Sequence, residues 1–433
     1  MPIFKDFEPK EVQDGAVPPT LRNDLSKSIG MLVLKKNLTK NGNTYVFNAA
    51  PSLDKHLRSL HPGATGVDSK IDFLTQQSLG FGTAFVVANS IMGTAGNIVM
   101  TDQRISEDIV EGNGFYVVFD YQVRNGHPLT SFSLDQVREV VLDGILIARR
   151  GELPDYCFFR TTEAIKTPYN LPLPLVGSQT LAANTNLATA GFPLGLPMKY
   201  SAGQMRAYDD KNANFYYAAS VDNGCAGSPI FAVGPNNAVS SQVIGIARRG
   251  HTPSYNVDVK SKQVVRGTGD ATKKLQWEEA QRVDAIRWAV DQTAAVTLLL
   301  TFKHVDPHPM AATVVVTCNG KDGKPLALGQ VDVPPVLPAT PISCNITGKL
   351  PSGLLPIELR KISFQVKDAK TPSDAIRLTS LKLQIGNPRV PTEFVSRSRE
   401  NYGIPGTALP LTIEFPQVDV NVNAVVSQPS PRK

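Results

Sequence analysis

Three residues of this chain differ in the hydrolytic chemistry that their side chains could perform. Asp155 precedes an apolar run (YCFF, 156–159), and a carboxylate there could orient a neighbouring base. Arg104 carries a guanidinium that stays protonated at physiological pH, so it cannot take a proton as an imidazole does. Ala226 lies in the loop NGCAGSPIF (223–231), and its methyl group cannot attack a carbonyl carbon. These residue types predict a chain without serine nucleophile and histidine base chemistry.

The same three positions lie in segments that resemble the trypsin-like serine peptidase family. The loop 223–231 is similar to the family's nucleophile loop, Gly-Xaa-Ser-Gly-Gly/Ser-Pro, with Ala226 in place of the serine. Residues 82–87 (GTAFVV) and 97–104 (NIVMTDQR) resemble the pattern that delivers the catalytic histidine, with Arg104 in its place. Residues 153–159 (LPDYCFF) resemble the strand that carries the orienting aspartate. The resemblance therefore implies a degenerate catalytic triad in which only Asp155 is retained.

Four further segments extend the likeness, toward a bacterial branch of the family, over residues 29–293. They are GFYVVFDY (114–121), AGFPLGLPMKY (190–200), VIGIARRG (243–250) and DAIRWAV (284–290). The resemblance implies two six-stranded barrels, the first ending near Thr161 and the second near Thr293. It also implies an amphipathic helix at 284–290 that closes the second barrel.

The resemblance also implies that the geometry of a substrate site outlasts the lost side chains. The backbone N–H groups of Gly224 and Ala226 match the family's oxyanion hole, which depends on main-chain conformation. The cleft strand is expected at Gly245, Ile246, Ala247 and Arg248, where an extended peptide could add as a further strand. Binding without cleavage is thus the function that this geometry would allow.

Two alternatives to a natural loss of the nucleophile are open. Ala226 could be an engineered change made in an active enzyme, although the histidine segment departs at Asp102, Gln103 and Arg104 together. Cys225 could act as the nucleophile instead. In the family, the side chain at this position turns inward, and no histidine is evident to form the thiolate.

The chain's 433 residues, 33 glycines and 33 prolines suit an all-β protein with two globular domains. We expect an extended N-terminal arm at 1–28 and a trypsin-like domain at 29–293. Strand-like runs after residue 294, separated by proline-rich joints, predict a β-sandwich at 294–424, with a long loop at 388–407. Residues 425–433 are typical of a disordered tail.

Charge, cysteine usage and termini restrict the partners. The N-terminus lacks a signal-peptide pattern and the apolar runs are too short to span a bilayer, which predicts a cytoplasmic protein or one released without a classical signal peptide. Four cysteines suit reduced thiols, although Cys318 and Cys344 could pair if the protein is exported. The basic segment 248–274 has Tyr255 as its only aromatic residue, so a solvated rim is favoured over nucleic-acid binding. We expect no cofactor. His304, Asp306 and His308 alternate, but the neighbouring prolines favour a turn over a metal site.

The sequence therefore predicts an all-β chain, a trypsin-like double β-barrel followed by a C-terminal β-sandwich. The predicted function is that of an inactive serine protease homologue, a pseudoprotease. Its partner would be a protein or peptide in the inter-barrel cleft or on the β-sandwich. The alternatives are a serine endopeptidase captured as an inactivated active-site variant and a structural subunit of a larger complex.

Overall fold

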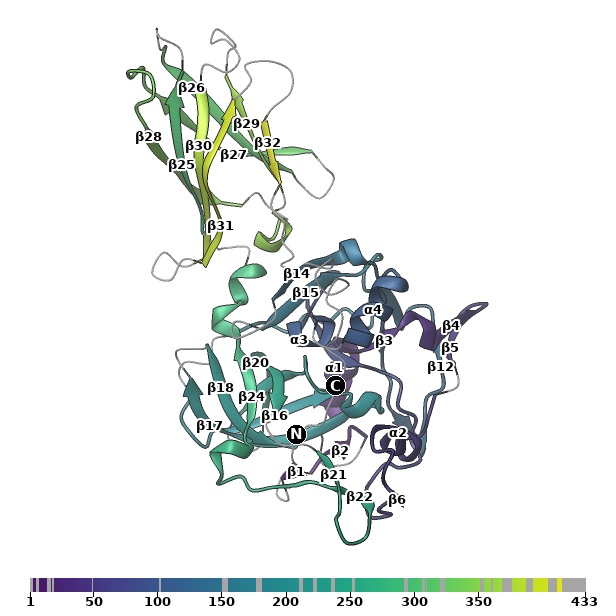
Figure 1. Ribbon diagram of the computed structural model, residues 1–433. Helices are drawn as coiled ribbons and strands as arrows, with labels where there is room; N and C mark the ends of the chain where they lie inside the picture. The colour runs from purple at the N-terminus through teal and green to yellow at the C-terminus, as the bar shows by residue number, and fades with distance from the viewer. Residues whose placement is uncertain are drawn as a thin grey trace. The chain divides into compact units, whose positions relative to one another are not determined.

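The computed structural model divides the chain into two compact units, residues 1–286 and 287–417. The residues that the structure describes are 3–4, 8–13, 17, 19–48, 50–100, 103–149, 155–176, 181–209, 213–220, 224–234, 238–250, 254–291, 295–305, 308, 310–319, 324–350, 354–359, 361–367, 376–386, 392–403 and 411–414. Strands dominate both units, which confirms the predicted all-β class (Figure 1). The predicted tail, 425–433, lies outside the described residues.

The first part of unit 1 is a seven-stranded antiparallel sheet. In spatial order its strands are β13 (Val137–Val140), β9 (Phe115–Phe119), β3 (Ile29–Leu34), β7 (Gly82–Ala88), β8 (Ile91–Thr94), β15 (Tyr156–Arg160) and β14 (Ile145–Arg149). Every residue of the interior strand β3 is buried, which explains its nearly continuous apolar sequence. Within the described residues no pairing joins the edge strands β13 and β14. The sheet is therefore an open half-barrel rather than the predicted closed barrel of six strands.

The second part of unit 1 is a closed barrel of six strands. They are β16 (Asn186–Gly191), β19 (Pro229–Val233), β20 (Val239–Gly250), β24 (Glu278–Arg282), β18 (Asn214–Ala219) and β17 (Lys199–Asp209). The ring closes because β16 pairs with both β19 and β17. Leu187, Phe215, Tyr217 and Ile230 pack in its interior. The sequence prediction of a six-stranded second barrel is confirmed.

The N-terminal arm was predicted to be extended, and this is wrong for its last part. Residues Pro19–Ser28 form helix α1. Leu21 and Leu25, four residues apart, are both buried, and proline is well tolerated in the first helical turn. Before the helix, β2 (Lys10–Glu11) pairs with β17, and β1 (Ile3–Phe4) pairs with β23 (Thr268–Gly269).

The helix predicted at 284–290 is also wrong. The segment forms two short 3-10 helices, η7 (Val283–Ala285) and η8 (Arg287–Ala289). The remaining α-helices among the described residues are α2 (Leu53–Leu60), α3 (Gly96–Met100) and α4 (Gln103–Glu111). Unit 1 has further small sheets formed by β12 (Ser131–Ser133), β5 (Thr44–Phe47) and β4 (Leu38–Asn41), by β21 (Tyr255–Val257), β22 (Gln263–Arg266) and β6 (Gly66–Val67), and by β10 (Val123–Arg124) and β11 (His127–Pro128).

Unit 2 consists of two four-stranded antiparallel sheets. One contains β28 (Ile342–Lys349), β25 (Ala295–His304), β30 (Ile376–Gly386) and β31 (Thr392–Gly403), and the other contains β27 (Pro325–Val333), β26 (Ala312–Asn319), β29 (Lys361–Val366) and β32 (Leu411–Glu414). Alternate residues such as Val314, Val316 and Cys318 are buried, so each sheet has one inner face. Strand β31 lies within the segment predicted to be a long loop, so that prediction is wrong.

Candidate functional site

Asp155 is the buried centre of the candidate site. It directly precedes β15, and only 1% of its surface is exposed. Its backbone N–H donates to Gln281 Oε1 of β24 at 2.9 Å, which fixes the residue between the half-barrel and the closed barrel. Its carboxylate accepts hydrogen bonds from the backbone N–H of Asn97 at 2.8 Å and from Arg248 Nε at 2.6 Å.

Arg248 joins this carboxylate to a second one. Its Nη1 lies 3.2 Å from Glu279 Oε1, and Arg249 Nε lies 2.6 Å from the other carboxylate oxygen of Glu279. Asn214 also donates to Glu279, at 2.7 Å. We call the residues Asn97, Asp155, Arg248, Arg249 and Glu279 the Asp155 cluster. Its two carboxylates and two guanidinium groups balance in charge.

The electrostatics of Asp155 follow from this burial. Removal from water raises the pKa of the Asp155 carboxyl above its usual range, and the Arg248 guanidinium and the amides of Asn97 and Gly96 offset part of this effect. A carboxylate engaged by Arg248 and by backbone amides is occupied as an ion-pair partner. It is held in place by contacts that differ from those needed to orient an imidazole.

Asn97 is a site residue that sequence reasoning missed. It lies in the first turn of α3, just after β8, and its side-chain Nδ2 donates to the carbonyl oxygen of Arg248 at 3.1 Å. A carboxamide has no basic nitrogen, so it cannot accept a proton from a nucleophile. A signal was present in the sequence. The spacing expected before the histidine position, a threonine with a polar residue three positions later, occurs twice, in TAGN (94–97) and in TDQR (101–104).

Arg104 was the position predicted for the lost histidine. It lies in α4, and its side chain lies outside the described residues. The structure brings the earlier of the two similar segments, 94–97, to Asp155. This placement follows from β8 and β15 pairing directly, with Cys157 opposite Thr94.

The loop around Ala226 is held in a defined turn. Gly224 and Gly227 have φ values of +92° and +89°, which side-chain-bearing residues rarely adopt. Thr83 of β7 fastens the loop, since its hydroxyl donates to Gly224 O at 2.9 Å and its N–H donates to Ala226 O at 3.2 Å. Within the described part of the chain, the amide groups of Gly224 and Ala226 have no backbone acceptor. With these two backbone donors, this loop resembles an anion-binding turn. The side chain that it carries at position 226 is a methyl group.

The predicted cleft strand is largely inside the sheet. Gly245 and Ile246 pair with β19 on one edge and with β24 on the other. The N–H and C=O of Ala247 bond to Ser228 and Gly227 at 2.9 and 2.7 Å. The backbone groups of these three residues are therefore not available to pair with an added peptide strand. Among the described residues, Arg249 and Gly250 have a strand partner only on the β24 side, and Arg248 lies at a shift in register where Asn97 engages its carbonyl.

No metal centre or membrane helix is found in the part of the chain that the structure describes. No group of three His, Cys, Asp or Glu residues there could hold a metal ion. Buried His304 instead bonds through Nε2 to the carbonyl of Pro334 at 2.9 Å. None of the described helices is long and apolar enough to cross a membrane. Cys318 and Cys344 form no disulfide with each other.

Comparison with known proteins gives one kind of match. No protein-family model matches the chain, and no curated protein matches its sequence. Among solved structures, it is similar to Rv3671c from M. tuberculosis H37Rv, a serine-to-alanine mutant in an inactive form, at 13% identity and a TM-score of 0.26. That match covers 46% of this chain and 75% of the other. At this level of similarity the match defines no family for the chain.

Proposed function

We propose that this protein is a catalytically inactive homologue of trypsin-like serine peptidases that acts by binding a protein or peptide, or in assembly. The observation that carries the proposal is the state of Asp155. Its carboxylate accepts hydrogen bonds from the guanidinium of Arg248 and from the backbone N–H of Asn97, and neither group can transfer a proton as a histidine would.

Three separate requirements of serine peptidase chemistry are unmet in the Ala226 loop and the Asp155 cluster. A nucleophile is missing because position 226 is alanine. Asn97, whose backbone N–H contacts Asp155, carries a carboxamide that bonds to the carbonyl of Arg248 and is not a base. The carboxylate itself is neutralised by a guanidinium. Because these three unmet requirements lie on separate segments of the chain, the proposal does not depend on Ala226 alone.

Two features support a binding role. The N–H groups of Gly224 and Ala226 could hold a carbonyl or carboxylate oxygen of a peptide. The exposed side chain of Arg249, 55% accessible, lies on the part of β20 that has a strand partner on one edge only among the described residues. An acidic, extended segment that ends near the Ala226 loop is the ligand that these features fit best.

The test is peptide-library cleavage and labelling by a fluorophosphonate, applied to the natural chain and to three revertants. The revertants are Ala226→Ser, Ala226→Ser with Asn97→His, and these two together with Arg248→Ser. We expect no activity from the natural chain or from Ala226→Ser, since a lone serine lacks a base. Activity from the triple variant alone would show that the cleft is still built for peptides.

Cleavage by the natural chain would overturn the proposal. Activity of Ala226→Ser alone, at the level of a working peptidase, would favour the alternative of an endopeptidase inactivated at one position. If no revertant is active, a peptide array probed with the natural chain tests binding directly. Binding of extended acidic peptides would support the proposal if Arg249→Glu abolishes that binding. An array without binders would contradict the peptide-binding role.

A further inference from the structure

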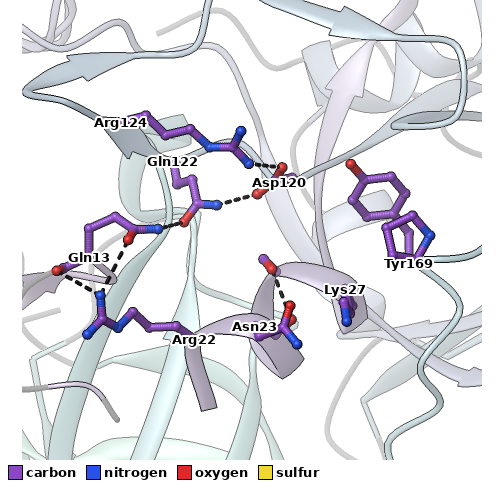
Figure 2. Close-up of a pocket in the computed structure, with 10 residues that line it drawn as sticks. Gln13, Arg22, Asn23, Lys27, Asp120, Gln122, Arg124 and Tyr169 are labelled. Carbon is purple, nitrogen blue, oxygen red and sulfur yellow. Dashed lines mark hydrogen bonds and ion pairs between the residues drawn. The ribbon is translucent and has the colours of Figure 1, made fainter. Parts of the chain in front are cut away.

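A polar pocket of about 420 Å³ lies in unit 1 and shares no residue with the Asp155 cluster. Figure 2 shows its two main walls. Helix α1 forms one wall, and the segment that follows β9 forms the other. Because the pocket is independent of the degenerate site, a ligand bound here would be a second function of the chain.

The helical wall is the polar face of an amphipathic helix. Arg22, Asn23 and Lys27 line the pocket, and their spacing places them on one side of α1. On the other side, Leu21 and Leu25 are 8% and 1% exposed. The apolar side anchors the helix, so the polar side is held toward the pocket.

The second wall is built on an alternating pattern. Asp120, Gln122 and Arg124 follow one another at every second position, and all three line the pocket. Asp120 and Gln122 are 6% and 5% exposed. The carboxylate of Asp120 accepts hydrogen bonds from Gln122 and Arg124, and the residue has a φ of +62°, which aspartate tolerates better than most residues.

A hydrogen-bond chain joins the two walls. Gln13 Nε2 donates to Gln122 Oε1 at 2.6 Å, and Arg22 donates to the backbone oxygen of Gln13 at 3.2 Å. Tyr169 closes one side and stacks on Phe119 with ring centroids 5.6 Å apart. Burial raises the pKa of Tyr169 to about 12, so its hydroxyl adds no negative charge at neutral pH. The walls are thus linked before any ligand enters.

The charges of the lining residues are unbalanced. Arg22, Lys27 and Arg124 contribute three positive charges, and Asp120 contributes one negative charge that Arg124 already engages. Among the described residues, the Lys27 ammonium has no partner in an ion pair or hydrogen bond. We propose that this pocket binds a small dianion, an organic phosphate or a dicarboxylate. Guanidinium forks and the amide donors of Asn23 and Gln122 match the oxygens of such groups.

The test is calorimetric titration of the full chain with two dianions, glycerol 3-phosphate and succinate. We expect one-to-one binding of at least one probe, weakened when NaCl is raised from about 0.05 to about 0.5 M because the contacts are ionic. Lys27→Met should weaken binding about tenfold or more, the effect of one charge-assisted hydrogen bond. Lys40→Met is the matched control, because Lys40 is an exposed lysine on β4, outside the pocket.

The two probes separate the ligand classes. Preference for glycerol 3-phosphate assigns a phosphate ligand, and preference for succinate assigns a dicarboxylate. No binding of either probe, or binding equal in Lys27→Met and the natural chain, would overturn the proposal. Circular dichroism and thermal unfolding check that the Lys27 variant is folded. Binding that does not weaken with salt would also contradict it, whatever the behaviour of the variant.

Discussion

Replacement of Arg248 by methionine tests whether the Asp155 cluster is a structural ion-pair network. The guanidinium contacts Asp155 at 2.6 Å and Glu279 at 3.2 Å, and the side chains of all three residues are at most 5% exposed. Arg248→Met leaves two buried carboxylates without this cation, which costs about 3–5 kcal/mol in comparable buried pairs. This is a large share of a domain stability of about 5–15 kcal/mol.

Urea unfolding followed by tryptophan fluorescence measures this loss. The chain has two tryptophans, and a Trp288→Phe background leaves Trp277 of unit 1 as the reporter. Arg249→Met is the matched control, because Arg249 pairs with the same Glu279 at 2.6 Å but its side chain is 55% exposed. Exposed pairs contribute about 0–1 kcal/mol, so this variant should unfold nearly as the natural chain does.

The pH dependence gives a second readout of the same change. Burial raises the pKa of Asp155, and Arg248 offsets part of the rise, so the variant should have an Asp155 pKa that is higher still. A carboxyl group whose pKa is raised in the folded state binds its proton more tightly there, and stability then increases as pH falls through that pKa. The loss of unfolding free energy caused by Arg248→Met should therefore become smaller as the pH is lowered from neutral.

The reasoning would be refuted by a small, pH-independent effect. A loss below about 1 kcal/mol, equal to that of Arg249→Met, would mean that water or other groups compensate the two carboxylates. The double variant Asp155→Asn, Arg248→Met should recover part of the loss, because one unpaired charge is removed.

Three further predictions concern the elements that hold the site and the rest of the chain. Gly227→Ala should lower the free energy of unfolding by more than about 1–2 kcal/mol, since a Cβ there would lie 2.0 Å from Thr83 O at a φ of +89°. Gly42→Ala is the control in the same urea assay, because Gly42 has a φ of +57° but no atom within 4 Å of an added Cβ. Lys199→Met should lower the free energy of unfolding by about 1–3 kcal/mol and expose the N-terminal arm to limited proteolysis, because buried Lys199 forms an ion pair with partly buried Glu11 at 2.7 Å. Unchanged proteolysis would show that β2 pairing alone holds the arm. Burial raises the pKa of Cys318 to about 11, so iodoacetamide at pH 8 should label half-buried Cys344 before Cys318. Peptide mass mapping measures the order of labelling, and labelling of Cys318 first would contradict the burial of Cys318.

Local patterns predicted many strands but missed helix α1. Continuous or alternating apolar runs identified β3 and β26 because each buries a whole strand or one face of it. Helix α1 was missed because two leucines among polar residues are a weak signal until its apolar side is covered. Strand β31 was missed for a related reason, since its charged residues disfavour a strand in isolation, whereas pairing with β30 forms one.

The candidate site divides in the same way. Ala226 and the glycines of its turn could be identified from the sequence because a missing hydroxyl and a left-handed backbone are local properties. The partners of Asp155 could not. Asn97 and Arg248 are 58 and 93 residues distant from it in the chain, and TAGN and TDQR are equally spaced candidates for the same place.

The sequence by itself thus determined the all-β class and placed alanine, which carries no nucleophile, at position 226. The tertiary structure decided which groups surround the carboxylate of Asp155. Pairing of β8 with β15 brings Asn97 to Asp155, and the passage of β20 beside them brings Arg248. The physical reason is that a buried charge must find a partner wherever the fold brings one close, and strand pairing between distant segments is what brings it.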